Sequence, residues 1–244
     1  MKILITGASS GIGRELARHY ASSENELILI ARREERLQEL SDELTSKVKR
    51  LTLIVVDLRE FELVQEKLRC ISSLDMVILN AGISLGHGRG RATTKSFRNL
   101  FDVNLFANHA ILEVLLPLFQ KQQFGKIVFI SSLSALFPMP SAKVYSASKV
   151  ALNNYAQALR YKYKKENIKV VTILPGFIES ELTAKNNFSM PFLLSTKEGV
   201  ERIVYAIEKN KREYVFPKRL YYVVKFLNLL PHFLRENIVE RFQP

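Results

Sequence analysis

The chain has 244 residues, of which 47% are hydrophobic and 25% charged, so a disordered, collagen-like or low-complexity protein is excluded. With 36 Lys and Arg against 24 Asp and Glu, the net charge is +12, which makes cofactor phosphates, nucleic acids and anionic lipids candidate partners. A single cysteine, Cys70, allows no intrachain disulfide and no cysteine cluster, so we expect a reducing, cytoplasmic location and no metal site.

Short apolar runs alternate with longer amphipathic segments along the whole chain. The expected strands span residues 2–5, 26–31, 51–56, 75–79, 126–130, 169–174 and 213–216, and the expected helices span residues 11–22, 34–46, 60–70, 95–120, 146–166 and 197–210. The alternation predicts an α/β fold, with a doubly wound parallel sheet of about seven strands flanked by helices. No Pro-, Gly- or Ser-rich linker divides the chain, so we expect one domain over residues 1–244.

The first expected strand runs into a glycine-rich turn, Thr6-Gly7-Ala8-Ser9-Ser10-Gly11-Ile12-Gly13, which precedes a helix. Glycine permits positive φ and close approach of the backbone, and a helix N-terminus attracts anions. The spacing differs from the G-x-G-x-x-G pattern, so by itself the turn leaves open a bend without a ligand. In this context it predicts a dinucleotide pyrophosphate site with Gly7, Ser9, Ser10, Gly11, Ile12 and Gly13 as contacts.

The second expected strand ends in Ala31-Arg32-Arg33, where an NAD site would carry an acidic residue for the ribose hydroxyls. Guanidinium groups suit the 2′-phosphate of NADP, so Arg32, with Arg33 beside it, favours NADP (NADPH) over NAD. The alternative for this pair alone is a solvated start to the next helix.

Further candidates follow the third and fourth strands, at the carboxyl edge where doubly wound sheets bind ligands. Asp57 and Leu58 follow the third strand, and the Asp57 carboxylate is a candidate acceptor for the adenine amino group. Asn80-Ala81-Gly82 follows the fourth strand. We therefore expect both segments to line the cofactor site.

Tyr145 and Lys149 lie four residues apart near the start of an expected helix, and so on one face of it. A lysine cation favours phenolate, so we expect a lowered pKa for Tyr145 and a general acid or base role for its hydroxyl. Ser131-Ser132 follows the fifth strand, where a hydroxyl can hold a substrate oxygen. Asn104, a polar residue in an apolar stretch, either contacts something buried, such as a relay water, or fixes its helix.

These segments resemble, in order, the T-G-x-x-x-G-x-G, N-A-G and Y-x-A-S-K motifs of the short-chain dehydrogenase/reductase family. The resemblance covers nearly the whole chain and implies a Rossmann-like domain that forms a homodimer or homotetramer. It implies hydride transfer between a nicotinamide cofactor and a small-molecule carbonyl or alcohol substrate, with carbonyl reduction as the usual direction for NADPH.

The resemblance also implies a catalytic tetrad of Asn104, Ser132, Tyr145 and Lys149. Tyr145 would exchange the proton and Ser132 would orient the substrate. Lys149 would contact the nicotinamide ribose, and Asn104 would hold a relay water.

The family's P-G segment corresponds to Pro175-Gly176-Phe177-Ile178. By the resemblance its backbone and a following hydroxyl, here Ser180, meet the nicotinamide amide. Ser180 stands where the family usually has threonine, and Leu79 stands where a second asparagine is frequent. Neither departure removes a catalytic group.

The loop at residues 84–93, with its alternating glycines, and the segment at residues 179–195 are candidate binding loops. The second carries apolar side chains typical of a lid over a lipophilic carbonyl compound, namely Leu182, Phe188, Met190, Phe192, Leu193 and Leu194. Packing within the loop or against a subunit would need the same residues.

The tail at residues 217–244 combines basic with apolar residues. We favour a helix pair that covers the sheet edge or a subunit, and peripheral membrane contact is the alternative. A redox sensor or scaffold that binds NADP without turnover is a rival to the enzyme, although the tetrad favours catalysis. We do not expect nucleic-acid binding, because the cations are dispersed and no nucleic-acid motif is found.

Overall fold

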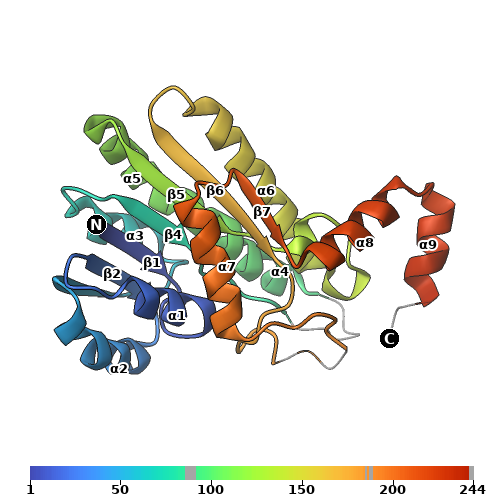
Figure 1. Cartoon of the computed structure of the whole chain (residues 1–244), viewed down its shortest axis with the longest axis horizontal. Coiled ribbons are helices and arrows are strands. Elements are labelled where there is room, and N and C mark those ends of the chain that lie inside the picture. Colours follow the sequence, from blue (N-terminus) through green and yellow to red (C-terminus); the bar gives the residue numbers. More distant parts are fainter. Residues whose placement is uncertain (86–91, 185, 187–188, 242–244) are drawn as a thin grey trace.

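The structure, a computed structural model, describes residues 1–85, 92–184, 186 and 189–241. Within these ranges seven strands form one parallel sheet in the order β3-β2-β1-β4-β5-β6-β7, which confirms the predicted fold class (Figure 1). The strands are β1 (Lys2–Thr6), β2 (Glu26–Ala31), β3 (Arg50–Val55), β4 (Met76–Leu79), β5 (Gly125–Ile130), β6 (Ile168–Pro175) and β7 (Glu213–Phe216). The predicted loop glycines Gly86, Gly88 and Gly90, Phe188 of the expected lid and the last three tail residues lie outside the described residues.

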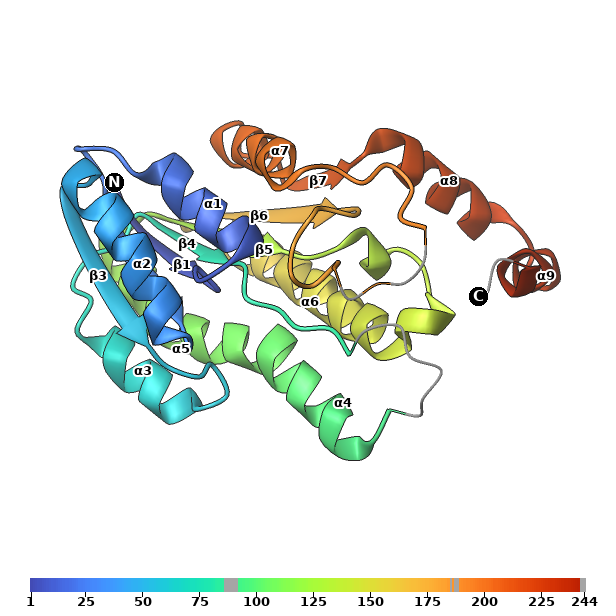
Figure 2. The same cartoon turned by 90° about the horizontal axis from the view of Figure 1, so that it is seen from below.

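Alternate residues of the central strands enter two hydrophobic clusters, one on each face of the sheet. On β1, Ile3 and Ile5 belong to one cluster and Leu4 to the other, as the two-residue period of a strand requires. The first face is covered by α1 (Gly11–Tyr20), α2 (Glu34–Leu44) and α7 (Thr196–Glu208), and the second by α3 (Phe61–Arg69), α5 (Ala107–Gln122) and α6 (Lys143–Lys162). Figure 2 shows the sheet between these two layers.

The expected helix at residues 95–120 is a longer helical run of three parts. It consists of α4 (Thr94–Phe101), a π-helical turn η2 (Asp102–Phe106) and α5. By length and composition the run could cross a membrane. However, Leu112, Leu115 and Phe119 are completely buried in the cluster beside the sheet, so we assign the run to the core.

The tail forms two helices, α8 (Lys218–Leu229) and α9 (His232–Arg241). Val224 of α8 packs with Leu133 and Leu174, close to the ends of β5 and β6. In both Figure 1 and Figure 2, α8 leads away from the sheet and α9 lies at its outer end. The inner side of α8 thus covers this end of the sheet.

Candidate active site

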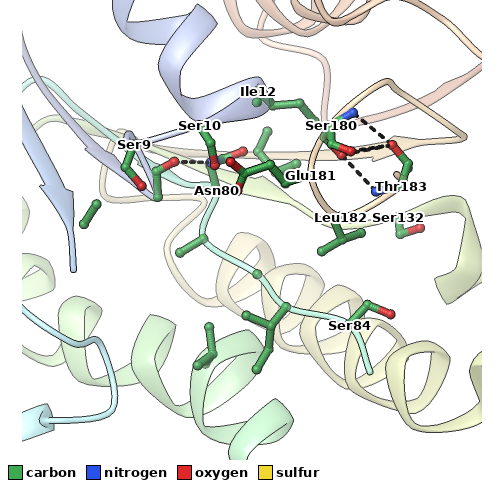
Figure 3. Close-up of a pocket in the computed structure, with 18 of the residues that line it drawn as sticks. Ser9, Ser10, Ile12, Asn80, Ser84, Ser132, Ser180, Glu181, Leu182 and Thr183 are labelled. Atoms are coloured by element: carbon green, nitrogen blue, oxygen red, sulfur yellow. Dashed lines mark hydrogen bonds between the residues drawn. The ribbon is translucent and has the colours of Figure 1, made fainter. Parts of the chain in front are cut away.

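A pocket of about 390 Å³ opens at the carboxyl edge of the sheet. It lies across the ends of β1 and β4, which pair in the sheet although two strands separate them in the sequence. Such a switch point is where doubly wound folds bind ligands. Every predicted site residue except Gly13 and Asn104 lines the pocket, namely Gly7, Ser9, Ser10, Gly11, Ile12, Arg32, Arg33, Asp57, Leu58, Asn80, Ala81, Gly82, Ser132, Tyr145, Lys149, Pro175, Gly176, Ile178 and Ser180. Several of these are shown in Figure 3.

The turn between β1 and α1 has a shape that depends on its glycines. Gly7 has a φ of +69°, and a Cβ on Gly13 would lie 2.3 Å from the Gly7 carbonyl oxygen. Asn80 braces the turn from the end of β4, because its Nδ2 donates to the Thr6 carbonyl at 3.0 Å. The backbone therefore forms a tight turn at the N-terminus of α1. The glycine-rich residues 7–13 of this turn fit the pyrophosphate of a dinucleotide.

The two arginines after β2 take different positions. The Arg33 guanidinium reaches over the turn and donates to the Ser9 Oγ at 3.1 Å and the Ser10 Oγ at 2.6 Å. Arg32 is 67% exposed, and its Nη1 lies 3.9 Å from the Asp57 carboxylate. A hydrogen bond from Arg59 lowers the pKa of the Asp57 carboxyl. Arg33 rather than Arg32, the principal candidate from the sequence, contacts the turn.

The catalytic candidates meet where β5 ends and α6 begins. Ser132 and Tyr145 both line the pocket, and hydrogen bonding by the Ser132 side chain lowers the pKa of the Tyr145 hydroxyl. The Lys149 Nζ lies 5.7 Å from the centre of the Tyr145 ring and donates to the Ile130 carbonyl at 2.9 Å. Ser131 instead directs its hydroxyl to the backbone carbonyl of Lys149, at 3.5 Å. Ser132 is therefore the serine that meets Tyr145.

Burial determines the pKa of both titratable groups. It raises the pKa of Tyr145 to about 12, and the hydrogen bond with Ser132 offsets part of this effect. Burial also lowers the pKa of Lys149 to about 8. The expected lowering of the Tyr145 pKa is therefore wrong, because the loss of hydration outweighs the lowering effect of the hydrogen bond with Ser132. At neutral pH Tyr145 is protonated and can donate a proton.

The amide of Asn104 is fully buried and hydrogen-bonded at both ends. Its Oδ1 accepts from the Ile83 N–H at 2.8 Å, and its Nδ2 donates to the Ile83 carbonyl and to the Ser148 Oγ, each at 3.0 Å. The Ser148 hydroxyl in turn donates to the Tyr145 carbonyl at 2.8 Å. Asn104 thus ties the segment after β4 to the turn of α6 that carries Tyr145. The relay water stays a prediction.

A family model described as short chain dehydrogenase matches residues 1–190, which contain all of these motifs. The chain belongs to the short-chain dehydrogenase/reductase family. It is therefore an NAD(P)-dependent oxidoreductase that acts on CH–OH or C=O groups of a small-molecule substrate.

Relatives of this short-chain dehydrogenase/reductase cover most of its length. An uncharacterized oxidoreductase of Myxococcus xanthus is 32% identical over 244 residues, which are 98% of this chain and 96% of the relative. An uncharacterized oxidoreductase of Mycobacterium tuberculosis is 36% identical over 216 residues, which are 86% and 85% of the two chains. The solved structure of a short-chain dehydrogenase from Sphingobium yanoikuyae in complex with NADPH matches with a TM-score of 0.84 at 23% identity, over 99% of this chain and 96% of the other.

In this short-chain dehydrogenase/reductase the segment after β6 forms one wall of the pocket. A parallel bridge between Ile178 and Leu194 holds its two ends together. Thr183 lines the pocket, accepts from the Ser180 N–H at 2.9 Å and donates to the Ile178 carbonyl at 2.7 Å (Figure 3). Sequence reasoning missed Thr183, although its position three residues after Ser180 was an available signal.

Two further residues of this segment line the pocket, and one is charged and the other apolar. Glu181 lines the pocket and pairs with Arg33 at 2.7 Å and with Arg36. Nothing in the sequence around Glu181 signals this contact. Leu182 lines the pocket, whereas Phe192 is 44% exposed.

Proposed function

We propose that the chain is an NADP(H)-dependent reductase of lipophilic ketones or aldehydes. The observation that carries the cofactor preference is Arg33, whose guanidinium lies over Ser9 and Ser10 in the glycine-rich turn. A 2′-phosphate beside Arg33 and Arg32 gains charge-assisted hydrogen bonds. The ribose hydroxyls of NAD need an acceptor instead, and no acidic residue stands between the end of β2 and Glu34.

When bound, NADPH supplies the hydride. In the proposal residues 7–13 hold its pyrophosphate, and Arg32 and Arg33 hold its 2′-phosphate. Lys149 binds the nicotinamide ribose. The nicotinamide side of the pocket is formed by Pro175, Gly176, Ile178 and Ser180.

Tyr145 is the proposed proton donor to the carbonyl oxygen. Its raised pKa keeps the hydroxyl protonated at neutral pH, as reduction requires. The Ser132 Oγ accepts the Ser134 N–H at 3.1 Å, so its own proton is left to donate toward Tyr145 or the substrate oxygen. The ammonium of Lys149, 5.7 Å from the centre of the Tyr145 ring, stabilises the phenolate that remains after the transfer.

The lining of the pocket supports an apolar substrate. Ile83, Val103 and Leu182 line it together with the catalytic residues. Of the cationic lining residues, Arg32 and Arg33 belong to the end proposed for the cofactor, and Lys149 donates to the Ile130 carbonyl. A ketone or aldehyde with apolar substituents can therefore pack against the apolar lining near Tyr145.

The test is a fluorescence titration of the purified protein with NADPH and NADH, followed by turnover of a panel of ketones, aldehydes, diketones and 3-oxoacyl thioesters. We expect tighter binding of NADPH, and loss of this preference in Arg33→Ala and Arg32→Ala. Arg18→Ala is the matched control, since Arg18 pairs with Glu43 on α2 and does not line the pocket. Equal losses of NADPH and NADH affinity would contradict the assignment of the 2′-phosphate. Cofactor binding without turnover of any compound would favour a redox sensor.

A further inference from the structure

The tail presents an apolar surface to solvent. Three aromatic or aliphatic residues recur at intervals of four and three positions along α8, namely Tyr222, Phe226 and Leu229, and Phe233 follows on α9 after the extended residue Leu230. Each of the four is 61% to 76% exposed. Val223 and Leu234 are exposed beside them, at 51% and 41%. We call these six residues the outer face of the tail. Large exposed apolar patches commonly mark interaction sites.

The opposite side of α8 is fixed to the domain. Leu220, Val224 and Leu227 pack in the cluster that contains Leu133 and Leu174. The Asn228 Nδ2 also donates to the Leu136 carbonyl at 2.7 Å. Because the inner side alone accounts for the packing of α8, the outer face is not needed for folding.

The charges on α8 are all positive. This helix carries Lys218, Arg219 and Lys225 and no acidic residue, whereas α9 carries Arg235 beside Glu236. At 100° per residue, Lys218 and Lys225 lie on one side of the row formed by Tyr222, Phe226 and Leu229, and Arg219 lies on the other. The row is thus flanked by cations on both sides of α8.

We propose that the outer face docks on the surface of an anionic lipid bilayer. Apolar side chains enter the interface between headgroups and acyl chains, and flanking Lys and Arg attract acidic headgroups. In Figures 1 and 2 the tail projects from the sheet, which leaves this face open. A second copy fits this face less well, because α8 packed against α8 would bring cations together with no acidic residue on the helix.

The location of the tail suits this role. The helix α8 begins at Lys218, directly after the carboxyl end of β7, and the pocket opens at the carboxyl edge of the same sheet. Because the outer face is already exposed, docking on a membrane requires no rearrangement of the domain. The proposal does not depend on the redox function, and its test needs neither cofactor nor substrate.

The experiment is co-sedimentation of the full chain with vesicles of phosphatidylcholine alone and with vesicles of equal parts phosphatidylcholine and phosphatidylglycerol. We expect binding to the anionic vesicles and much weaker binding to the neutral ones. Lys218→Gln combined with Lys225→Gln should weaken binding by roughly 30-fold, since each cation near an anionic surface contributes about fivefold. Phe226→Ser combined with Leu229→Ser should weaken it by about tenfold or more.

Tyr161→Ser is the matched control, because Tyr161 is 69% exposed but lies on α6, away from the tail. It should bind vesicles as the unaltered chain does. Circular dichroism checks that all variants are folded. No sedimentation with anionic vesicles, or equal sedimentation of all variants, would overturn the proposal. So would a dimer that dissociates in the Phe226→Ser, Leu229→Ser variant while vesicle binding is unchanged, since the outer face would then be a subunit contact.

Discussion

The carboxylate of Glu181 pairs with the guanidinium of Arg33 at 2.7 Å, although 148 residues separate the two in the sequence. The same carboxylate pairs with Arg36 on α2. Glu181 belongs to the segment after β6, so the contact joins the wall of the pocket to the arginine proposed for the 2′-phosphate. An anion that binds Arg33 competes with a carboxylate already in place.

Glu181→Gln should therefore tighten NADPH binding. The side chain is about half exposed, and pairs of this kind contribute up to about 1 kcal/mol, so a gain of roughly threefold to fivefold is expected. NADH affinity should not change, because NADH lacks the competing phosphate. Glu179→Gln removes the same charge from a neighbouring exposed position that does not line the pocket and is the control in titrations of both cofactors. Weaker NADPH binding by Glu181→Gln would show that Glu181 supports the site instead.

Tyr145→Phe should abolish turnover and keep cofactor affinity. The ring still packs, but the proton that reduction consumes is gone, so we expect kcat to fall by about 10²-fold to 10⁴-fold or more. Tyr155→Phe, on the same helix, removes a hydroxyl that bonds the His109 Nδ1 at 2.9 Å and should remain active. Retained activity of Tyr145→Phe would remove Tyr145 from the proposed mechanism.

The pH dependence of carbonyl reduction should report Lys149. Its pKa of about 8 lies below the ordinary 10.5, so the lysine is charged at neutral pH and loses its proton as the pH rises through about 8. If the charged form is the active one, kcat/KM for NADPH should fall about tenfold per pH unit above that value. Tyr145, with a pKa of about 12, contributes no descending limb in this range.

The control for this profile is Lys126→Met. Burial also lowers the pKa of Lys126, but this residue donates to the Ile207 carbonyl and does not line the pocket. The profile should keep its shape in that variant. A flat profile from neutral pH to about pH 10 would contradict a role for the Lys149 cation.

Gly13→Ala should destabilise the protein and weaken cofactor binding together. The added Cβ meets the Gly7 carbonyl oxygen at 2.3 Å, which forces the turn apart at a cost of about 1–3 kcal/mol. In a chain of this size each kcal/mol lowers Tm by roughly 2–4 °C. In Gly82→Ala the closest atom is 3.5 Å away, so Tm should not change. Thermal unfolding with and without NADPH measures both effects.

The motifs were predictable because each is local in the sequence. A strand, a run of glycines and a helix specify the tight turn at residues 7–13, and a spacing of four places Tyr145 and Lys149 on one helical face. The expected strands differ from the observed ones by at most one residue at either end. This agreement reflects continuous apolar runs bounded by polar turns.

The features of the site that the sequence does not predict depend on contacts between distant segments. The pairing of Glu181 with Arg33 requires the folded pocket, and the partners of the Asn104 amide, Ile83 and Ser148, lie in other segments of the chain. The direction of the Tyr145 pKa shift depends on burial, which outweighs the hydrogen bond with Ser132. Spacing alone indicates which side chains meet but not how much water surrounds them.

The two hydrogen bonds between Asn104 and the Ile83 backbone reduce the conformational entropy that would otherwise be lost when a ligand binds. Ile83 follows β4 in a stretch without regular secondary structure, yet its N–H and carbonyl are both held by a buried side chain, as a neighbouring strand would hold them. The conformational entropy of this stretch is thus lost when the chain folds. A ligand that arrives here meets a wall already in place, so less of its binding free energy is spent on ordering the protein.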